Sequence, residues 1–257
     1  MEQRYIVHEL LKSITNSLSL NIPRASREAQ LLLMSYLNVD ELWLITNQST
    51  QVQNVEKLLE WVERRAKNEP FEYITNKVSF YSEEFYIAPG ALIPRPETEI
   101  LIDEVLKYAP DLNAAFQFAE VGVGSGIISI MLAKKFPNAR IIAVDISADA
   151  LRIAQENIQR FGLQNRIELR LGSLLDVVSE KIDYLVSNPP YIENGVSLES
   201  NLDYEPQNAL FGGKVGDEII KALLDEVLKR EIKFFSCEMG YDQKDKISSY
   251  LKDTKIK

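Results

Sequence analysis

The segment Asn188-Pro189-Pro190-Tyr191 holds residue types whose spacing could do chemistry. Asn188 and Pro189 each precede a proline, so both are pushed toward extended backbone. Neither proline has an N–H group, so the Pro189 carbonyl can face a cleft with its lone pairs free, beside the carbonyl of the Asn188 side chain. Two acceptors can hold the two N–H bonds of a planar amide or an exocyclic amine. Tyr191 offers an aromatic face to stack on that planar group.

A glycine-rich loop, Glu120 to Gly126, reads Glu-Val-Gly-Val-Gly-Ser-Gly and follows a predicted strand. Its glycines allow a tight turn and a close approach of the backbone to a ligand. The dinucleotide fingerprint needs a glycine at position 127, which is Ile127, and the lysine of a phosphate-binding loop is also missing. The loop is therefore a poor match to a pyrophosphate site. The alternative is a tight turn that binds nothing.

Asp145 ends the next predicted strand, where a carboxylate can accept two hydrogen bonds from a ribose diol. The alternative is that Asp145 caps the following helix, although Ser147 is at least as good a cap. Together with the glycine loop, Asp145 favours a cofactor that carries a nucleoside but no pyrophosphate. S-adenosylmethionine fits that description, with its amino-acid moiety near the glycine loop.

Transfer of a methyl group to nitrogen is the chemistry that these two sites favour. An amide nitrogen is a poor nucleophile because its lone pair is delocalised, so the protein must align nitrogen, methyl and sulfur. Positive charge develops on the nitrogen, and acceptor dipoles placed there stabilise it. No strong base is needed, since the extra proton of the product is acidic and can leave to water. The alternative for residues 188–191 is a stiff surface loop.

The elements that must position these residues change in pattern along the chain. Residues 1–72 are predicted to form helices only, because their apolar residues recur at helical spacing. Residues 73–96 are predicted to be a linker with a β-hairpin and a proline-rich loop. The hairpin strands are expected at 78–81 and 85–88, around a turn at Ser82-Glu83-Glu84.

Residues 97–257 alternate short apolar strands with helices, which is typical of a parallel sheet covered on both faces. The strands are predicted at 115–121, 141–145, 167–171, 184–187 and 234–238. The helices are predicted at 97–108, 127–135, 148–161 and 217–230. The sequence therefore predicts an α/β fold with a doubly wound sheet, whose ligands bind at the carboxyl ends of the strands, at the topological switch point.

Composition and charge argue against several classes of protein. The chain has 29 basic and 38 acidic residues, a net charge of −9, and no block of Lys or Arg, so no direct nucleic acid partner is expected. No apolar run approaches the roughly 20 residues that span a bilayer, so no membrane is expected either. One cysteine, Cys237, and one histidine, His8, cannot make a disulfide or a conventional zinc site. We expect a cytoplasmic protein without a metal.

Four further runs carry a family resemblance. Residues 93–99 read Ile-Pro-Arg-Pro-Glu-Thr-Glu, and residues 238–243 read Glu-Met-Gly-Tyr-Asp-Gln. Tyr204-Glu205-Pro206 is followed by Ala209-Leu210 and Gly212-Gly213, and Asn68-Glu69-Pro70 by Tyr73-Ile74. Most of the chain thereby resembles the class I S-adenosylmethionine-dependent methyltransferases of the N5-glutamine branch, and most closely the peptide chain release factor glutamine methyltransferases (PrmC, also called HemK). The run at 93–99 is the one specific to this family, since many amino-group methyltransferases share the glycine loop and the 188–191 segment.

The resemblance implies a class I methyltransferase Rossmann-like fold over residues 97–257, and a helical N-terminal domain, residues 1–72, that contacts the substrate protein or only stabilises the chain. It implies methylation of the glutamine in the Gly-Gly-Gln motif of class 1 release factors, with S-adenosylhomocysteine as the second product. A monomer is expected.

The resemblance also implies roles for single residues. The substrate amide would be held by Asn188 and Pro189, with Pro190 and Tyr191 completing the substrate-binding segment and Asn188, Pro189 and Tyr191 as the catalytic group. Arg95 to Glu99 would border the methionine end of the cofactor or brace the loop. The cofactor-binding residues would be Glu120, Gly122, Val123, Gly124, Ser125, Gly126, Asp145, Leu174 and Asn188, with Ser173 as the alternative to Leu174.

Three departures from the family pattern stand out. Glu120 replaces the usual Asp, and its carboxylate is expected to reach the methionine ammonium through one more methylene. Val123 replaces a common Thr, which removes any hydroxyl contact. After a helix at 243–251, residues 253–257 leave room for one short strand, so the far edge of the sheet is expected to be incomplete and the stability lower.

Three other functions remain open from the sequence. An amino-methyltransferase for adenine in DNA shares the 188–191 motif, but needs base flipping and a basic groove, against which the net charge argues. A glutamine methyltransferase for a ribosomal protein would differ only in its partner. A cofactor-binding module without catalysis is the third, and the intact 188–191 segment argues against it.

Overall fold

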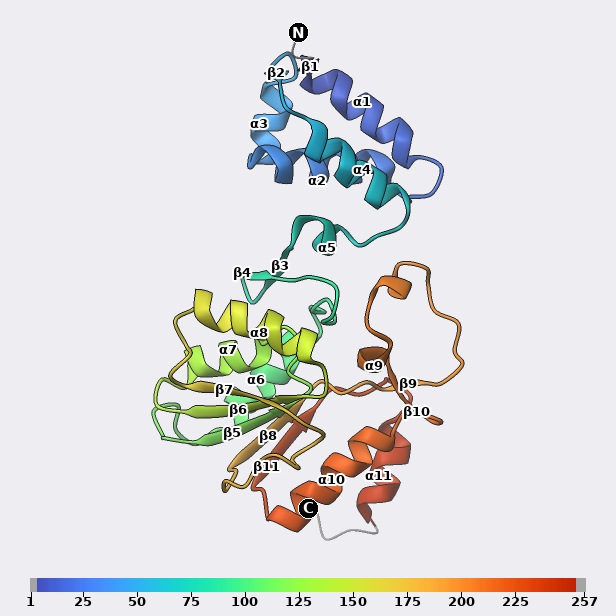
Figure 1. Ribbon diagram of the computed structural model, residues 1–257. Helices are drawn as coiled ribbons and strands as arrows, with labels where there is room; N and C mark the ends of the chain where they lie inside the picture. Colours follow the sequence, from blue (N-terminus) through green and yellow to red (C-terminus); the bar gives the residue numbers. More distant parts are fainter. Residues whose placement is uncertain (1–3, 253–257) are drawn as a thin grey trace. The chain divides into compact units, whose positions relative to one another are not determined.

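The protein, which a computed structural model describes for residues 4–252, folds as two units, Met1–Asn76 and Lys77–Lys257 (Figure 1). The first unit is built mainly from helices. These are α1 (Val7–Leu18), α2 (Ala25–Leu37), α3 (Glu41–Thr46), α4 (Glu56–Ala66) and α5 (Phe71–Thr75).

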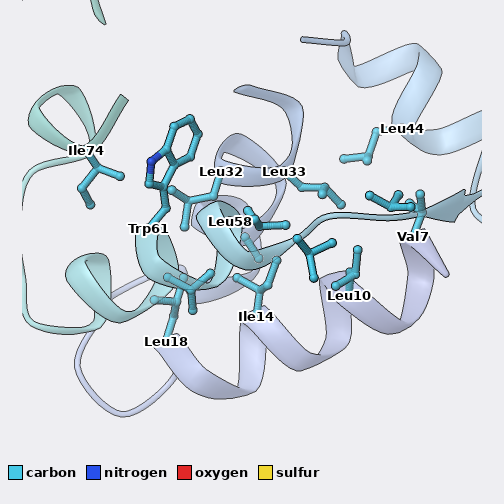
Figure 2. Close-up of a cluster of buried hydrophobic side chains, with 14 of the residues drawn as sticks. Val7, Leu10, Ile14, Leu18, Leu32, Leu33, Leu44, Leu58, Trp61 and Ile74 are labelled. Atoms are coloured by element: carbon cyan, nitrogen blue, oxygen red, sulfur yellow. The ribbon is translucent and has the colours of Figure 1, made fainter. Parts of the chain in front are cut away.

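The core of the first unit lies where the apolar faces of its helices meet. Along α1, Leu10, Ile14 and Leu18 are buried at the three- and four-residue spacing of one helix face. They pack with Leu32 and Leu58 from α2 and α4, as Figure 2 shows. The first unit therefore has a hydrophobic core of its own.

The first unit contains two short strands that the sequence did not predict. β1 (Tyr5–Ile6) pairs antiparallel with β2 (Gln51–Val52), whereas residues 1–72 were expected to contain helices only. Two residues are too few for the alternation of apolar and polar side chains that marks a strand.

No helix within residues 4–252 is both long enough and apolar enough to cross a membrane.

The second unit begins with a β-hairpin whose turn differs from the prediction. β3 (Lys77–Phe80) pairs with β4 (Glu83–Tyr86), so the two turn residues are Tyr81 and Ser82 rather than residues 82–84. Both have positive φ, 53° and 62°, as a two-residue hairpin turn requires. Such turns usually carry Asn or Gly, so Tyr81 was not expected in the turn, and of the two residues only Ser82 belonged to the predicted one.

Five parallel strands form the central sheet of the second unit, in the order β11-β8-β5-β6-β7. They lie where the sequence predicts strands. Their bounds are Gln117–Val121 for β5, Arg140–Asp145 for β6, Ile167–Leu171 for β7, Tyr184–Ser187 for β8 and Phe234–Cys237 for β11. From β5 the chain builds outward through β6 and β7, then returns to add β8 on the other side. The switch point therefore lies between β5 and β8.

Helices cover both faces of this sheet (Figure 1). On one face lie α6 (Thr98–Tyr108), α7 (Ile127–Lys135) and α8 (Ala148–Arg160); on the other lie α10 (Glu218–Arg230) and α11 (Lys244–Lys252). Every residue of α7 up to Ala133 is buried, as expected of a helix enclosed by the sheet and its helical neighbours. The predicted doubly wound α/β fold is confirmed.

Short elements after β8 were not predicted. β9 (Ile192–Glu193) pairs with β10 (Phe211–Gly213), and the chain between them contains a 3-10 turn, Leu202–Tyr204, and α9 (Gln207–Leu210). At the far end, β11 is an edge strand among the described residues. The strand considered for residues 253–257 lies outside the described residues.

Candidate active site

The carboxyl ends of β5 and β8 bring the two sequence motifs side by side. The glycine loop leaves β5 after Val121, and Asn188 follows β8 directly. Val121 and Ser187 are register partners in the parallel ladder. A Cβ atom added at Gly122 would lie 3.7 Å from the backbone carbonyl oxygen of Asn188. The sheet thereby places the glycine loop next to the 188–191 segment.

The conformation of the glycine loop is fixed by hydrogen bonds to β6 and by glycines with positive φ. The N–H groups of Gly122 and Val123 both donate to the Val144 carbonyl, at 2.8 and 3.1 Å, which ties the loop to β6. Gly122, Gly124 and Gly126 all have positive φ. A Cβ at Gly124 would meet no atom of residues 4–252 within 4 Å, so this glycine faces open space among them.

A cavity of about 300 Å³ lies over this switch point. Among its walls are the glycine loop, the residues after β6 and β7, Asn188, the proline-rich loop from Gly90 to Pro94 and the segment from Pro206 to Phe211. Of the predicted site residues, those that line it are Glu120, Gly122, Val123, Gly124, Ser125, Asp145, Leu174, Asn188 and Pro190, together with the alternative Ser173. Ten residues predicted from the sequence, in four separate segments, therefore line one cavity.

Three predicted site residues do not line the cavity. Gly126 packs against α8, where an added Cβ would lie 3.2 Å from the Cβ of Ala154. Pro189 is buried beneath the segment. Tyr191 turns away, and its hydroxyl donates to Glu238 Oε1 at 3.2 Å. Burial and the neighbouring Glu238 carboxylate raise the pKa of Tyr191 to about 12. Their roles in binding stay predictions.

Asp145 points its carboxylate toward the glycine loop. Its Oδ2 accepts a hydrogen bond from the Gly124 N–H and its Oδ1 one from the Ser147 N–H, both at 2.9 Å. Ser147 itself caps α8, since its hydroxyl accepts from the Ala150 N–H, so the cap role considered for Asp145 falls to Ser147. Burial raises the pKa of Asp145 despite these hydrogen bonds.

Glu120 is a fully buried carboxylate with one oxygen that has no partner. Its Oε2 accepts from the backbone N–H of Ser129 at 2.9 Å and from the Ser129 hydroxyl. Its Oε1 is buried and makes no hydrogen bond to any residue that the structure describes. Desolvation raises the pKa of Glu120 to about 8. An unpartnered carboxylate oxygen in a cavity wall is a site for a cationic group.

Glu120→Gln is expected to stabilise the protein without cofactor more at high pH than at low pH. The fold favours the protonated carboxyl, so Glu120 contributes stability below its unfolded pKa, which is lost as pH rises toward about 8. Melting temperatures of wild type and variant, measured between about pH 5 and about pH 9, should diverge as pH rises. Glu199→Gln, at an exposed glutamate, is the matched control. A constant difference would show that Glu120 is ionised in the fold.

Two cavity walls are joined by an ion pair that sequence reasoning did not foresee. Glu205 accepts from the backbone N–H of Ile93 at 2.9 Å and pairs with Arg95 at 2.5 Å. The Glu205 side chain is 1% exposed, so its charge depends on these two donors. The pair fastens the proline-rich loop to the segment that continues through Pro206. Only the family-like runs at 93–99 and 204–206 hinted at it.

Other residues of the site also lacked a signal of their own. Phe211 lines the cavity, yet an aromatic residue after a short helix is ordinary. Thr98 lines it too, within the stretch from Arg95 to Glu99 that the family resemblance placed near the cofactor. Gly212 lies so close to the Pro190 carbonyl oxygen that an added Cβ would collide with it. This collision explains the glycine in the Gly212-Gly213 pair, which the sequence shows only as a motif.

Family models match both parts of the chain. The model described as "Methyltransferase small domain" matches residues 96–203, and the model described as "PrmC N-terminal domain" matches residues 9–75. The first covers the glycine loop and the 188–191 segment. The second lies within the helical first unit.

Curated relatives match along most of the chain. The release factor glutamine methyltransferase of Koribacter versatilis is 40% identical over 240 residues, which are 90% of this chain and 84% of that protein. The protein of the same name from Clostridium acetobutylicum is 34% identical over 88% of this chain and 82% of its own length. The fold is that of a methyltransferase. The chain belongs to the release factor glutamine methyltransferase family.

Solved structures agree on the fold alone. The hMettl16 catalytic domain is similar with a TM-score of 0.56 and 16% identity, over 76% of this chain and 70% of that one. A human methyltransferase 10 domain containing protein is similar with a TM-score of 0.51 and 18% identity, over 67% of this chain and 78% of that one. Both confirm the predicted class of fold.

The charge of the cavity fits the methyl donor that such a fold uses. S-adenosylmethionine carries a sulfonium and an ammonium group. Among the described residues that line the cavity, Glu120 and Asp145 are acidic and none is Lys, Arg or His. A cavity with two carboxylates and no cation suits a positively charged ligand and disfavours a pyrophosphate. The unpartnered Oε1 of Glu120 and the open space at Gly124 are further places for such a ligand.

Proposed function

We propose that this protein transfers a methyl group from S-adenosylmethionine to the side-chain nitrogen of the glutamine in the Gly-Gly-Gln motif of class 1 release factors. The observation that carries the proposal is the side-chain amide of Asn188 in the wall of a cavity that, among the described residues, is lined by carboxylates and by no cation. The names of relatives that are 33–40% identical support the choice of substrate.

The residues that bind the donor are proposed to be Glu120, Asp145 and the glycine loop. Asp145 would accept from the ribose hydroxyls, because each of its oxygens keeps a free lone pair beside its backbone hydrogen bond. Glu120 would pair through Oε1 with the ammonium group. Leu174 or Ser173 would contact the adenine, since both line the cavity. When bound, S-adenosylmethionine supplies a methyl group activated by its sulfonium.

The residues that hold the substrate amide are proposed to be Asn188 and Pro189, through their carbonyl oxygens. Both acceptors hold the two N–H bonds of the glutamine and so orient the nitrogen lone pair toward the methyl group. They also stabilise the positive charge that develops on nitrogen. Pro190 would complete the wall of this subsite, and Tyr191, whose hydroxyl is held by Glu238, would support the segment from outside the cavity. The proton on the product nitrogen leaves to water.

The first unit is proposed to recognise the release factor. It has its own core and matches a family model separate from that of the second unit. Apolar side chains on its surface, among them Leu20, Leu42 and Ile45, are exposed and are candidates for contact with a protein partner. We assign residues 1–72 to recognition, 73–96 to a linker and 97–257 to catalysis. The enzyme is proposed to act as a cytoplasmic monomer.

The experiment that tests the function is transfer to the natural substrate. The protein is incubated with S-adenosylmethionine and an unmethylated release factor, and the peptides are mapped by mass spectrometry. One added methyl on the glutamine of Gly-Gly-Gln is the expected result, with none on a release factor whose glutamine is replaced. Methylation of a ribosomal protein or of adenine in DNA, with none on the release factor, would overturn the proposal.

A further inference from the structure

We infer that Thr98 and Glu238 are positioning residues that fix the orientation of the Asn188 side-chain amide. Neither belongs to the acceptor pair proposed to hold the substrate. The inference rests on the proposed function in one respect: the Asn188 carbonyl oxygen must face the substrate amide.

A chain of hydrogen bonds joins the three residues. The Asn188 Nδ2 group donates to Thr98 Oγ1 at 3.1 Å, and the Thr98 hydroxyl donates to Glu238 Oε2 at 2.7 Å. The other oxygen of Glu238 accepts from the Tyr191 hydroxyl at 3.2 Å. Glu238 is thus anchored from two sides, by α6 through Thr98 and by the 188–191 segment through Tyr191.

The register of the sheet places these residues together. Cys237 at the end of β11 is the ladder partner of Ser187 at the end of β8, so Glu238 and Asn188 are the next residues on neighbouring parallel strands. The backbone N–H of Glu238 donates to the Ser187 carbonyl at 3.1 Å and continues the ladder by one step. Thr98 is the first residue of α6 and lines the cavity, whereas Glu238 lies behind it.

The chain of hydrogen bonds has only one direction. Both oxygens of the Glu238 carboxylate accept, one from Thr98 and one from Tyr191, so the single hydroxyl proton of Thr98 is committed to Glu238. Thr98 Oγ1 can then only accept, and its partner must be the NH₂ end of the Asn188 amide. The carbonyl end of that amide takes no part in this chain of hydrogen bonds and is left to accept from a ligand.

The alternative orientation of the amide would oppose the reaction. With the amide flipped, the NH₂ group of Asn188 would face the N–H bonds of the substrate, and two donors cannot pair. An amide without the Thr98 contact would be free to take either orientation, and part of the enzyme would be unable to hold the substrate nitrogen. Thr98 and Glu238 therefore favour the productive orientation before the substrate arrives.

Thr98→Val tests this role, because valine keeps the shape of threonine and removes the acceptor. We expect kcat to fall by about 10- to 100-fold, since the substrate nitrogen is less often aligned. The Kd for S-adenosylmethionine, measured by calorimetry, should stay at its wild-type value. Thr98→Ser, which keeps the hydroxyl, should restore turnover. Thr75→Val is the matched control, since the buried Thr75 hydroxyl donates to the Phe71 carbonyl, inside the first unit.

Glu238→Gln tests the direction of the chain. A glutamine can donate to Thr98 Oγ1 through its NH₂ group, which lets the Thr98 hydroxyl donate to the carbonyl end of Asn188 instead. We expect kcat to fall while the melting temperature changes little.

In wild type, the hydrogens of the Asn188 NH₂ group, observed by NMR, should exchange slowly with water. Asn188→Ala assigns these signals. Exchange should become faster in Thr98→Val.

The two readouts separate this inference from the proposed function. If wild type does not methylate the release factor, the function is wrong, and the exchange of the Asn188 NH₂ group still tests its orientation. If wild type is active and Thr98→Val keeps both the wild-type kcat and slow exchange, the positioning role is overturned. Equal losses in Thr98→Val and Thr98→Ser would also overturn it, because the hydroxyl would then not be the group that matters.

Discussion

Asn188→Ala is expected to lower kcat for methyl transfer by about 10²- to 10³-fold, the usual cost of removing one polar group that stabilises transition-state charge. The side chain lines the cavity beside the glycine loop, and its carbonyl end is the acceptor proposed for the substrate nitrogen. Alanine removes that acceptor and leaves Thr98 Oγ1 without its donor. The Kd for S-adenosylmethionine should change much less, because Asp145 and the glycine loop remain.

The measurement for Asn188 is single-turnover kinetics with a release factor, together with calorimetry for the cofactor. Asn188→Asp is the informative companion, since it keeps the acceptor but cannot donate to Thr98 Oγ1 and adds a negative charge near Glu238. It should also lose turnover. Asn138→Ala, at an exposed asparagine in the second unit, should behave as wild type. Full turnover in Asn188→Ala would show that the substrate amide is held elsewhere.

Arg95→Met is expected to cost about 3 kcal/mol of unfolding free energy, which is the lower end of the range for removing one partner of a buried ion pair. The lower end applies because the Arg95 side chain is 34% exposed, whereas Glu205 is only 1% exposed. The variant leaves the Glu205 carboxylate with the Ile93 N–H as its remaining donor. Since this pair joins two cavity walls, affinity for the cofactor should fall as well.

Denaturant unfolding of a double-mutant cycle measures this ion pair. Arg95→Met combined with Glu205→Gln should be more stable than Arg95→Met alone, because a neutral amide is less costly to bury than an unpaired charge. Lys77→Met is the control, as its ion pair with Glu84 is exposed on the hairpin and should contribute little. If Lys77→Met and Arg95→Met lower the free energy of unfolding by the same amount, burial of the Glu205 carboxylate does not explain the contribution of the Arg95–Glu205 pair.

The sequence predicted the large elements because their signals are local. The strands of the sheet are short runs rich in apolar residues, four of which end at or just before glycine, asparagine or aspartate, and their parallel arrangement follows from their alternation with helices. The carboxyl ends of β5 and β8 were therefore predictable as neighbours, as were Gly122, Asp145 and Asn188 around one cavity. The family and the fold class are confirmed; the roles of the single site residues stay predictions.

What the sequence did not show depends on contacts between distant segments. Tyr81 and Ser82 form a hairpin turn without the usual turn residues, because the Tyr81 N–H donates to Glu99 at 2.7 Å from α6. Glu205 was visible as part of a motif, but nothing near it in sequence reveals the Arg95 partner. The orientation of Tyr191 away from the cavity likewise follows from Glu238, the residue that follows β11.

The hydrogen bond between Thr98 and Glu238 joins residues that are 140 positions apart. Chains are synthesised from the N-terminus, and folding of early segments begins before late ones leave the ribosome. The glycine loop, Asp145 and Asn188 all emerge before β11, so the walls of the cavity can form first. The direction of the Asn188 amide is then set only when residue 238 has emerged. On this view, the orientation of the Asn188 amide is among the last features of the cavity to be fixed during synthesis.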